Sequence, residues 1–293
     1  MDIKSLYTKD YYRDIQEGSR QSAKEIVPLV LELIQPRSVI DVGCGVGTWL
    51  SVFKECGVKD ITGVDGDYID KKMLQIPQER FLSFDLREPL LMDRQFDLVV
   101  SLEVAEHLPG ECAERFVDSL VRLGPVILFS AAIPFQGGQQ HINEQWPDYW
   151  AKHFQQRRYV VIDCIREKIW QNPNVEMWYA QNILMFVRQD YLRSYPLLKK
   201  VVENTTTSRL SIVHPRKYLA LQEKWTMLQT QLQPIQMQLQ SILNSKSYKL
   251  LSYPRSTLKK LPLVRDILKH ALDLLFSLYM KFCKKAEKRS PGK

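Results

Sequence analysis

A glycine-rich stretch near the start of the chain combines backbone freedom with one acidic side chain. Residues 38–49 read Ser-Val-Ile-Asp-Val-Gly-Cys-Gly-Val-Gly-Thr-Trp, so an apolar run that contains Asp41 is followed by Gly43, Gly45 and Gly47. An apolar run that breaks into glycines and then into helix-compatible residues predicts a strand, a tight loop and a helix. Glycines let backbone N–H groups approach a ligand, and the N-terminus of the following helix is partly positive. We therefore expect this loop to hold a nucleotide-like molecule.

The spacing of these glycines separates the loop from two common phosphate-binding loops. The dinucleotide-binding fingerprint needs a third glycine three residues after Gly45, where this chain has Thr48. No Gly-Lys-Ser/Thr run follows, which excludes a P-loop. Asp41 would repel a pyrophosphate but would favour a cationic ligand. A glycine-rich turn that binds nothing is the alternative.

Two further carboxylates follow short apolar runs that are predicted to be strands. Asp65 ends the run 60–65, and Asp85 ends the run 81–85. A carboxylate in such a position can accept hydrogen bonds from two neighbouring hydroxyl groups of a ligand. Aspartate also commonly begins turns, so a turn without a ligand is the alternative for both residues.

Two histidines and one glutamate could act on an acceptor molecule. Glu103 and His107 are four residues apart, which makes them neighbours if this stretch is helical. His141 lies in the polar, glycine-bearing segment 133–146, and such loops at strand ends often form substrate walls. Histidine can accept a proton near neutral pH, so His141 is our candidate general base. Structural roles, such as packing or helix capping, are the alternatives for both histidines.

Aromatic residues follow this segment directly, and they could stack on a sugar or close the core: Trp146, Tyr149 and Trp150. The chain has five cysteines without a CxxC pair, so neither a zinc site nor a disulfide framework is indicated. No carboxylate cluster could be assembled from the sequence either, and we expect no metal site. Reduced thiols and an N-terminus without an apolar signal core predict a cytoplasmic location.

The elements that must position these residues alternate between strands and helices. Apolar runs predict seven strands, at 38–42, 60–65, 81–85, 96–101, 125–132, 159–165 and 183–187. Helical spacing predicts helices at 18–34, 48–56, 110–123 and 146–157, with a weak helix at 68–76. This alternation predicts an α/β fold with a parallel or mostly parallel Rossmann-like sheet between helices. Ligands in such sheets bind beyond the carboxyl ends of the strands.

The C-terminal part of the chain differs in charge and pattern. Residues 240–293 have 13 basic against 3 acidic side chains, whereas residues 1–239 have 28 basic and 30 acidic ones. This imbalance indicates an anionic partner for the C-terminal segment. Its densest apolar stretch, 271–283, is too short to span a bilayer, which needs roughly 20 apolar residues. A basic amphipathic helix on an anionic membrane surface, or a disordered basic tail, are the two interpretations.

A heptad pattern precedes this basic tail. Apolar residues step by four and three along one seam: Leu221, Trp225, Leu228, Leu232, Ile235, Leu239 and Ile242. Such spacing predicts a helix that pairs with another helix, from a second copy or from the same chain. An amphipathic helix packed on the preceding domain is the alternative, and Pro234 is expected to kink or divide the helix. We expect four regions: an arm and helix (1–36), the α/β domain (37–190), a helical extension (191–244) and a basic tail (245–293).

Taken in order, the motifs of residues 38–188 resemble those of class I S-adenosylmethionine-dependent methyltransferases. The resemblance rests on the glycine loop, the two strand-end acids and the run 101–109, Ser-Leu-Glu-Val-Ala-Glu-His-Leu-Pro. It implies S-adenosylmethionine as methyl donor. It implies that the donor-binding residues are Asp41, Gly43, Gly45, Gly47, Asp65, Asp85, Leu86 and Ser101, with Asp65 at the ribose and Asp85-Leu86 at the adenine. Glu103, His107 and His141 are then the candidate catalytic residues.

The resemblance implies methyl transfer to a small molecule, and we expect an oxygen acceptor. A less specific resemblance, of the run Ser245-Lys-Ser-Tyr-Lys-Leu-Leu and the basic tail to bacterial enzymes of surface-polysaccharide biosynthesis, favours a carbohydrate acceptor. A methyltransferase-like scaffold without activity, which dimerises and docks on a membrane or on glycan-assembly enzymes, is the second hypothesis. Nucleic acid is not the expected acceptor, because Ser101-Leu-Glu-Val stands where a base-handling Asn-Pro-Pro-Tyr motif would stand.

Overall fold

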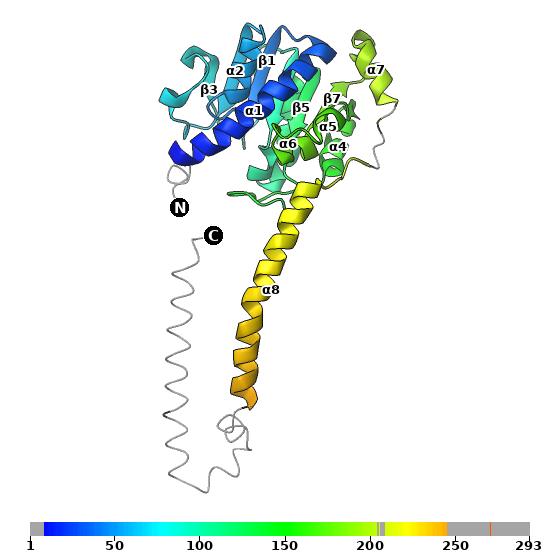
Figure 1. Cartoon of the computed structure of the whole chain (residues 1–293). Coiled ribbons are helices and arrows are strands. Elements are labelled where there is room, and N and C mark those ends of the chain that lie inside the picture. The colour runs from blue at the N-terminus through cyan, green and yellow to red at the C-terminus, as the bar shows by residue number, and fades with distance from the viewer. Residues whose placement is uncertain (1–8, 204, 206–208, 245–269, 271–293) are drawn as a thin grey trace. The chain divides into compact units, whose positions relative to one another are not determined.

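A computed structural model of the protein describes residues 9–203, 205, 209–244 and 270. The chain divides into two compact units, residues 1–220 and 221–293 (Figure 1). The first unit contains the sheet and every residue predicted to bind or to act on a ligand. No helix among the described residues is long and apolar enough to cross a membrane.

The first unit is built on one seven-stranded sheet. Its strands are β1 (Ser38–Val42), β2 (Asp60–Asp65), β3 (Phe81–Ser83), β4 (Leu98–Leu102), β5 (Val126–Ser130), β6 (Tyr159–Ile162) and β7 (Leu184–Arg188). Their order is β3-β2-β1-β4-β5-β7-β6, and β7 alone runs antiparallel to both of its neighbours. The strand order reverses between β1 and β4, so ligands are expected beyond the carboxyl ends of these two strands.

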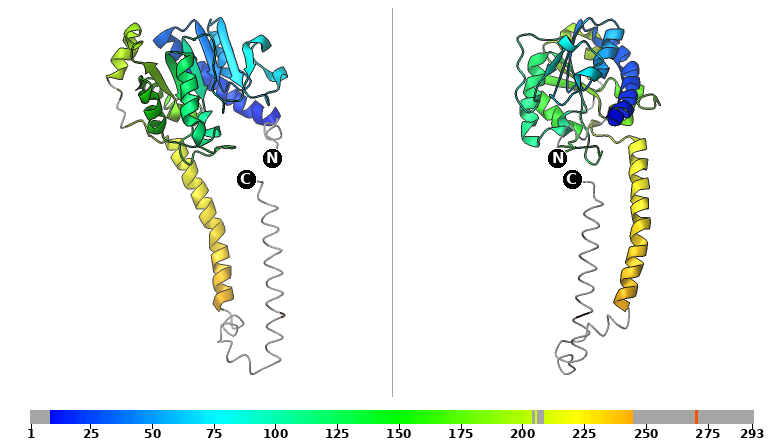
Figure 2. Two further views of the ribbon diagram at one scale, coloured as in Figure 1. Left: turned by 180° about the vertical axis from the view of Figure 1, so that it is seen from behind. Right: turned by 90° about the vertical axis from the view of Figure 1, so that its left-hand side faces the viewer.

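Helices cover both faces of the sheet (Figure 2). The helices are α1 (Lys9–Ile34), α2 (Thr48–Glu55), α3 (Ala113–Leu123), α4 (Pro147–Gln156), α5 (Arg166–Ile169), α6 (Met177–Asn182), α7 (Pro196–Val202) and α8 (Pro215–Asn244). One apolar core packs α1, α2 and α5–α7 against one face of the sheet, and a second core packs α3 and α4 against the other. Successive residues of β1, Val39 and Ile40, belong to opposite cores, because side chains alternate along a strand.

The predicted α/β fold is confirmed, and the first two strands have their predicted bounds. Two local predictions were wrong. The predicted helix 68–76 is reduced to a 3₁₀ turn at Lys71–Met73, and β3 ends at Ser83, which leaves Asp85 in the following turn. The run 101–109 is not an α-helix: Glu103 has a φ of 55°, and only Ala105–His107 forms a 3₁₀ turn.

The heptad region forms part of α8, a single helix from Pro215 to Asn244. Pro234, which was expected to kink or divide the helix, does not divide it, since the helix continues through this residue. The seam residues from Leu221 to Ile242 are each between 38% and 58% exposed. The predicted amphipathic tail lies outside the described residues, apart from His270.

Candidate active site

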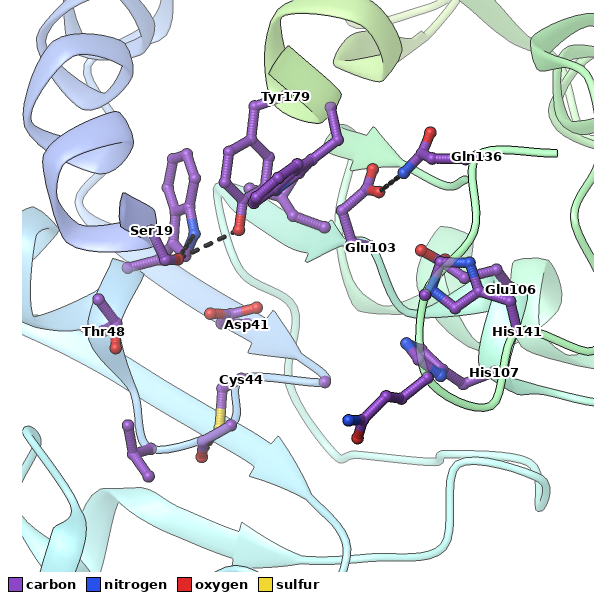
Figure 3. A pocket seen from close by; sticks show the side chains of 18 of the residues that line it. Ser19, Asp41, Cys44, Thr48, Glu103, Glu106, His107, Gln136, His141 and Tyr179 are labelled. Carbon is purple, nitrogen blue, oxygen red and sulfur yellow. Dashed lines mark hydrogen bonds between the residues drawn. The ribbon is translucent and has the colours of Figure 1, made fainter. Parts of the chain in front are cut away.

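A cavity of about 370 Å³ lies at the carboxyl ends of the strands in the first unit. The glycine loop after β1 forms one side of it, with Asp41, Cys44 and Thr48. The segments after β4 and β5 form the other side, with Glu106, His107 and His141 (Figure 3). The structure thus brings the predicted donor loop and the predicted acceptor segment to one cavity.

The glycine loop needs its glycines for conformation and for space. Gly43, Gly45 and Gly47 have φ values of 89°, 55° and 83°, a region that favours glycine. A Cβ atom on Gly43 would overlap the side chain of Val104, and one on Gly47 would lie 2.9 Å from Ile76. A Cβ atom on Gly45 would meet nothing within 4 Å, so this glycine leaves open space at the cavity.

Two buried carboxylates, those of Asp41 and Asp65, lie next to the glycine loop. Burial, and secondarily the charge of Asp65, raises the pKa of Asp41 well above its ordinary value of 3.8. Burial also raises the pKa of Asp65, although three hydrogen bonds partly offset the effect. Asp65 accepts these bonds from Gly45 N (2.7 Å), Gly66 N (2.6 Å) and Tyr68 Oη (2.5 Å). Asp65 therefore fixes the glycine loop directly, and the Tyr68 hydroxyl stands where a ligand hydroxyl would bind Asp65.

Five of the predicted donor residues do not line the cavity: Gly47, Asp65, Asp85, Leu86 and Ser101. Asp85 is exposed, and its carboxylate is paired in a bidentate manner with Arg87, which lowers the pKa of Asp85. Leu86 packs against the core on the α3–α4 face of the sheet. Ser101 is fully buried in β4. The roles of Asp85, Leu86 and Ser101 in donor binding stay predictions.

Glu103 lies at the end of β4 and faces the cavity in a strained backbone conformation. Its carboxylate accepts hydrogen bonds from Gln136 Nε2 (2.7 Å) and Asn182 Nδ2 (3.1 Å). Burial raises the pKa of Glu103, and these donors partly offset that rise. Phe135 and Gln140, in the segment after β5, also have positive φ values of 65° and 59°. Such strain persists only where the surrounding structure enforces it, which is common at functional sites.

The two predicted histidines lie against each other. The ring centroids of His107 and His141 are 4.9 Å apart, with the rings nearly perpendicular. Burial, together with the charge of His141, lowers the pKa of His107 to about 4. His141 Nδ1 lies 3.0 Å from Glu144 Oε1. The Glu144 carboxylate also accepts from Phe135 N (2.7 Å) and Gly137 N (2.8 Å), so it holds the whole segment in place.

Glu106, which the sequence analysis did not single out, lies beside these histidines. Its side chain is fully buried and lines the cavity. Burial, and then the nearby Glu103 carboxylate, raises the pKa of Glu106 well above its ordinary value. Its backbone oxygen accepts from Ile142 N (2.9 Å) and Asn143 N (3.0 Å), which brings His141 to the residues after β4. The spacing Glu103-x-x-Glu106-His107 was the signal that could have drawn attention to it.

An aromatic wall closes the cavity on the side of α1 and α6. Trp49 Nε1 donates to Ser19 Oγ, which is 3.1 Å from Tyr179 Oη, and the two aromatic rings are 5.1 Å apart. No sequence pattern predicted this wall, because its residues are far apart in the chain. The aromatics that the sequence did single out lie elsewhere. Trp150 is buried in the core against Phe129, and neither Tyr149 nor Trp146 lines the cavity.

The fold and the glycine loop define a Rossmann-like ligand-binding domain with an acidic side chain where phosphate-binding loops have none. A family described as "Methyltransferase domain" matches residues 12–130 of this chain. The matched range includes the glycine loop, both strand-end acids and the cluster at 103–107. Residues 12–130 therefore match a methyltransferase domain, and class I methyltransferases use S-adenosylmethionine as methyl donor.

Two curated relatives come from Rauvolfia serpentina. Ajmaline N-methyltransferase is 35% identical over 101 residues, which are 30% of this chain and 33% of the relative. Norajmaline N-methyltransferase is 31% identical over 110 residues, or 33% of this chain and 37% of the relative. The chain thus spans about a third of the length of these relatives.

Solved structures of methyltransferases match this chain at low identity. Magnesium protoporphyrin IX methyltransferase from Synechocystis PCC 6803 with bound SAH is 19% identical, with a TM-score of 0.44, over 59% of this chain and 84% of that one. An O-methyltransferase family protein from Burkholderia thailandensis is 13% identical, with a TM-score of 0.46, over 62% of this chain and 60% of that one.

Proposed function

We propose that the protein transfers a methyl group from S-adenosylmethionine to an oxygen atom of a small-molecule or carbohydrate acceptor. The observation that supports this proposal is the single cavity, which the glycine loop lines at one end and the Glu106–His107–His141 cluster at the other. A methyl donor on the loop would present its methyl group towards the cluster. The acceptor would then occupy the remaining space beside the segment 133–141.

The proposed reaction is an in-line displacement. A lone pair of the acceptor oxygen forms the new C–O bond, and the electron pair of the S–CH₃ bond moves to sulfur, which becomes neutral. The hydroxyl proton passes to a basic group of the cluster, for which His141 is the predicted candidate. Most of the rate enhancement in such a transfer comes from holding donor and acceptor in line. A cationic sulfonium also suits a site next to Asp41 and Glu103 better than an anion would.

The donor would use the residues predicted for it. Asp65 would accept from the ribose hydroxyls after Tyr68 moves away, the loop glycines would face the methionine part, and Asp85 with Leu86 would meet the adenine. A carbohydrate acceptor is favoured by the resemblance of the C-terminal part to polysaccharide-synthesis enzymes. The curated relatives are named as N-methyltransferases, so an amine is the acceptor class to test against oxygen acceptors.

The test is a screen of the purified protein with S-adenosylmethionine labelled in its methyl group. The panel contains nucleotide sugars, glycan extracts and matched amines. Label in a hydroxyl-bearing carbohydrate, as a base-stable methyl ether, is the expected result. Label only in amines would contradict the oxygen assignment and leave the methyl transfer in place.

The second candidate is a scaffold that has lost activity, and the exposed heptad seam of α8 is the observation that favours it. Titration calorimetry separates the active enzyme from the scaffold, because an active enzyme must bind the donor. Absence of binding heat at millimolar donor would support the scaffold.

We also propose peripheral contact with an anionic membrane through residues 245–293, on the cytoplasmic face. Co-sedimentation with phosphatidylserine vesicles, compared with neutral vesicles, tests that contact.

A further inference from the structure

Three side chains at the acceptor end of the cavity converge as metal ligands do. One potential ligand atom from each of Glu106, His107 and His141 lies within 4.8 Å of the other two. Ligand atoms around a tetrahedral ion with bonds of about 2.1 Å are roughly 3.4 Å apart, so the three side chains would have to move closer together by about 1 Å to coordinate one ion. They come from two segments, and the bonds from Ile142 N and Asn143 N to Glu106 O join these segments at the cluster.

The carboxylate of Glu106 has no hydrogen-bond partner among the described residues. It is fully buried, and this holds for both Oε1 and Oε2. The Glu103 carboxyl and the backbone N–H groups of Glu106 and Ala132 influence its pKa, but none of them reaches it with hydrogen-bonding geometry. Burying an unpaired carboxylate is costly, and either protonation or a bound cation compensates that cost.

The two imidazoles are arranged so that each has a nitrogen available. His107 Nδ1 is buried and has no partner among the described residues. His141 Nδ1 is engaged by Glu144, which leaves Nε2 for another ligand. A histidine whose second nitrogen is held by a carboxylate is the usual arrangement around bound metals, because the carboxylate fixes the ring and increases its basicity.

We propose that Glu106, His107 and His141 form a binding site for a divalent first-row transition-metal ion, which holds an oxygen atom of the acceptor. Two imidazoles and one carboxylate suit manganese, iron, cobalt or zinc better than magnesium or calcium, which prefer oxygen ligands alone. Three protein ligands leave coordination positions open to an acceptor hydroxyl on the cavity side. The ion itself does not depend on the proposed function, but the role of the acceptor oxygen does.

A bound cation reassigns His141 from general base to ligand. Its Nε2 lone pair would coordinate the ion and could not also take the acceptor proton. The cation would make the bound hydroxyl more acidic, so its proton would pass to water. This inference replaces the sequence-based expectation of no metal site, which rested on the spacing of cysteines and carboxylates along the chain.

The experiment measures binding of Mn²⁺ alone to the full-length protein after treatment with a chelator. Calorimetry and the loss of the free-ion electron paramagnetic resonance signal should both give one site per chain. Glu106→Gln and His141→Gln should each remove this site. Glu144→Gln should weaken it by roughly 10- to 100-fold, since it removes only the group that orients His141. His153→Gln, a histidine of α4 outside the cavity, is the matched control and should bind as the wild type does.

The outcomes separate the metal site from the methyl transfer. Far-ultraviolet circular dichroism establishes that each variant is folded before its binding is compared. Absence of Mn²⁺, Co²⁺ and Zn²⁺ binding, or equal binding by the wild type and Glu106→Gln, would overturn the metal site. Methyl transfer that persists unchanged in excess chelator would overturn the role of the ion at the acceptor oxygen and would leave the proposed function intact. A protein that binds Mn²⁺ at this site but never transfers methyl would contradict only the proposed function.

Discussion

At the scale of single residues, Asp65 combines a structural role with a predicted role in donor binding, and substitutions can test the second. It holds Gly45 and is predicted to bind the donor ribose. Asp65→Asn retains the shape but loses the charge that strengthens the hydrogen bonds, which contribute about 1.5 to 3 kcal/mol when charged. We expect donor affinity to fall by roughly 10- to 100-fold in titration calorimetry.

Tyr68→Phe is the matched comparison, because it removes the hydroxyl that donates to Asp65 Oδ1 and leaves the carboxylate unchanged. Donor affinity should stay the same or rise in this variant, since the ligand no longer competes with Tyr68. Equal donor affinity of Asp65→Asn and the wild type would remove the ribose role from Asp65.

The buried carboxyl of Asp41 predicts a dependence of stability on pH. Its pKa is raised in the folded protein above the ordinary 3.8, so the folded state retains the proton at pH values where the unfolded chain has lost it. The free energy of unfolding should therefore fall as the pH rises from about 4 through the raised pKa. Asp41→Asn should make this fall shallower.

Urea denaturation from mildly acidic to neutral pH measures this effect. Asp67→Asn, the same change at an exposed position, is the control and should retain the wild-type slope. A slope in Asp41→Asn as steep as that of the wild type would show that other groups cause the pH dependence.

At the scale of elements, the loop between β1 and α2 depends on Gly43 for both its conformation and its contact with Val104. Gly43→Ala should destabilise the protein by the cost of a left-handed residue, about 1 to 2 kcal/mol, plus roughly 1 to 3 kcal/mol of overpacking against Val104. Gly57→Ala has the same kind of backbone strain, with a φ of 100°, but meets nothing within 4 Å. In urea denaturation Gly43→Ala should lose clearly more stability than Gly57→Ala, and equal losses would contradict the contact with Val104.

The elements also show which features a sequence can predict. Apolar runs and glycine spacing predicted β1, β2 and the loop, because local preference and burial agree there. The turn at 103–107 could not be predicted, because Glu103 takes a positive φ that only its surroundings enforce, through Gln136, Asn182 and Ser130. The role of Glu106 could not be predicted, since its neighbour His141 is 35 positions further along the chain and is brought to it by backbone bonds.

At the scale of the whole molecule, the exposed seam of α8 predicts self-association. Seven apolar residues at heptad spacing are more than a third exposed, and a second copy would bury them in a coiled coil. Sedimentation equilibrium should show a dimer for the full-length protein. Leu228→Ala combined with Leu232→Ala should shift it to monomer, by removing two adjacent seam contacts.

Met227→Ala combined with Met237→Ala is the control, because both methionines are 63% exposed but lie off the seam. This variant should remain dimeric. A wild-type protein that sediments as a monomer at every concentration would exclude a second copy as the partner of this helix.

The backbone bonds of Glu106 to Ile142 and Asn143 hold the side-chain cluster of the cavity apart from the residues that would select the acceptor. The cluster and the acceptor selectivity could therefore evolve independently. They anchor one end of the segment after β5, and Glu144 anchors its middle through Phe135 and Gly137. Between these anchors Gly138 packs closely against His141, and a Cβ atom at this position would lie 2.2 Å from His141 Nε2. Gln136 and Gln139 also line the cavity, and Gln139 is exposed, so substitutions there would change which acceptors enter. Related enzymes could thus acquire new acceptors while the chemistry proposed for Glu106, His107 and His141 is inherited unchanged.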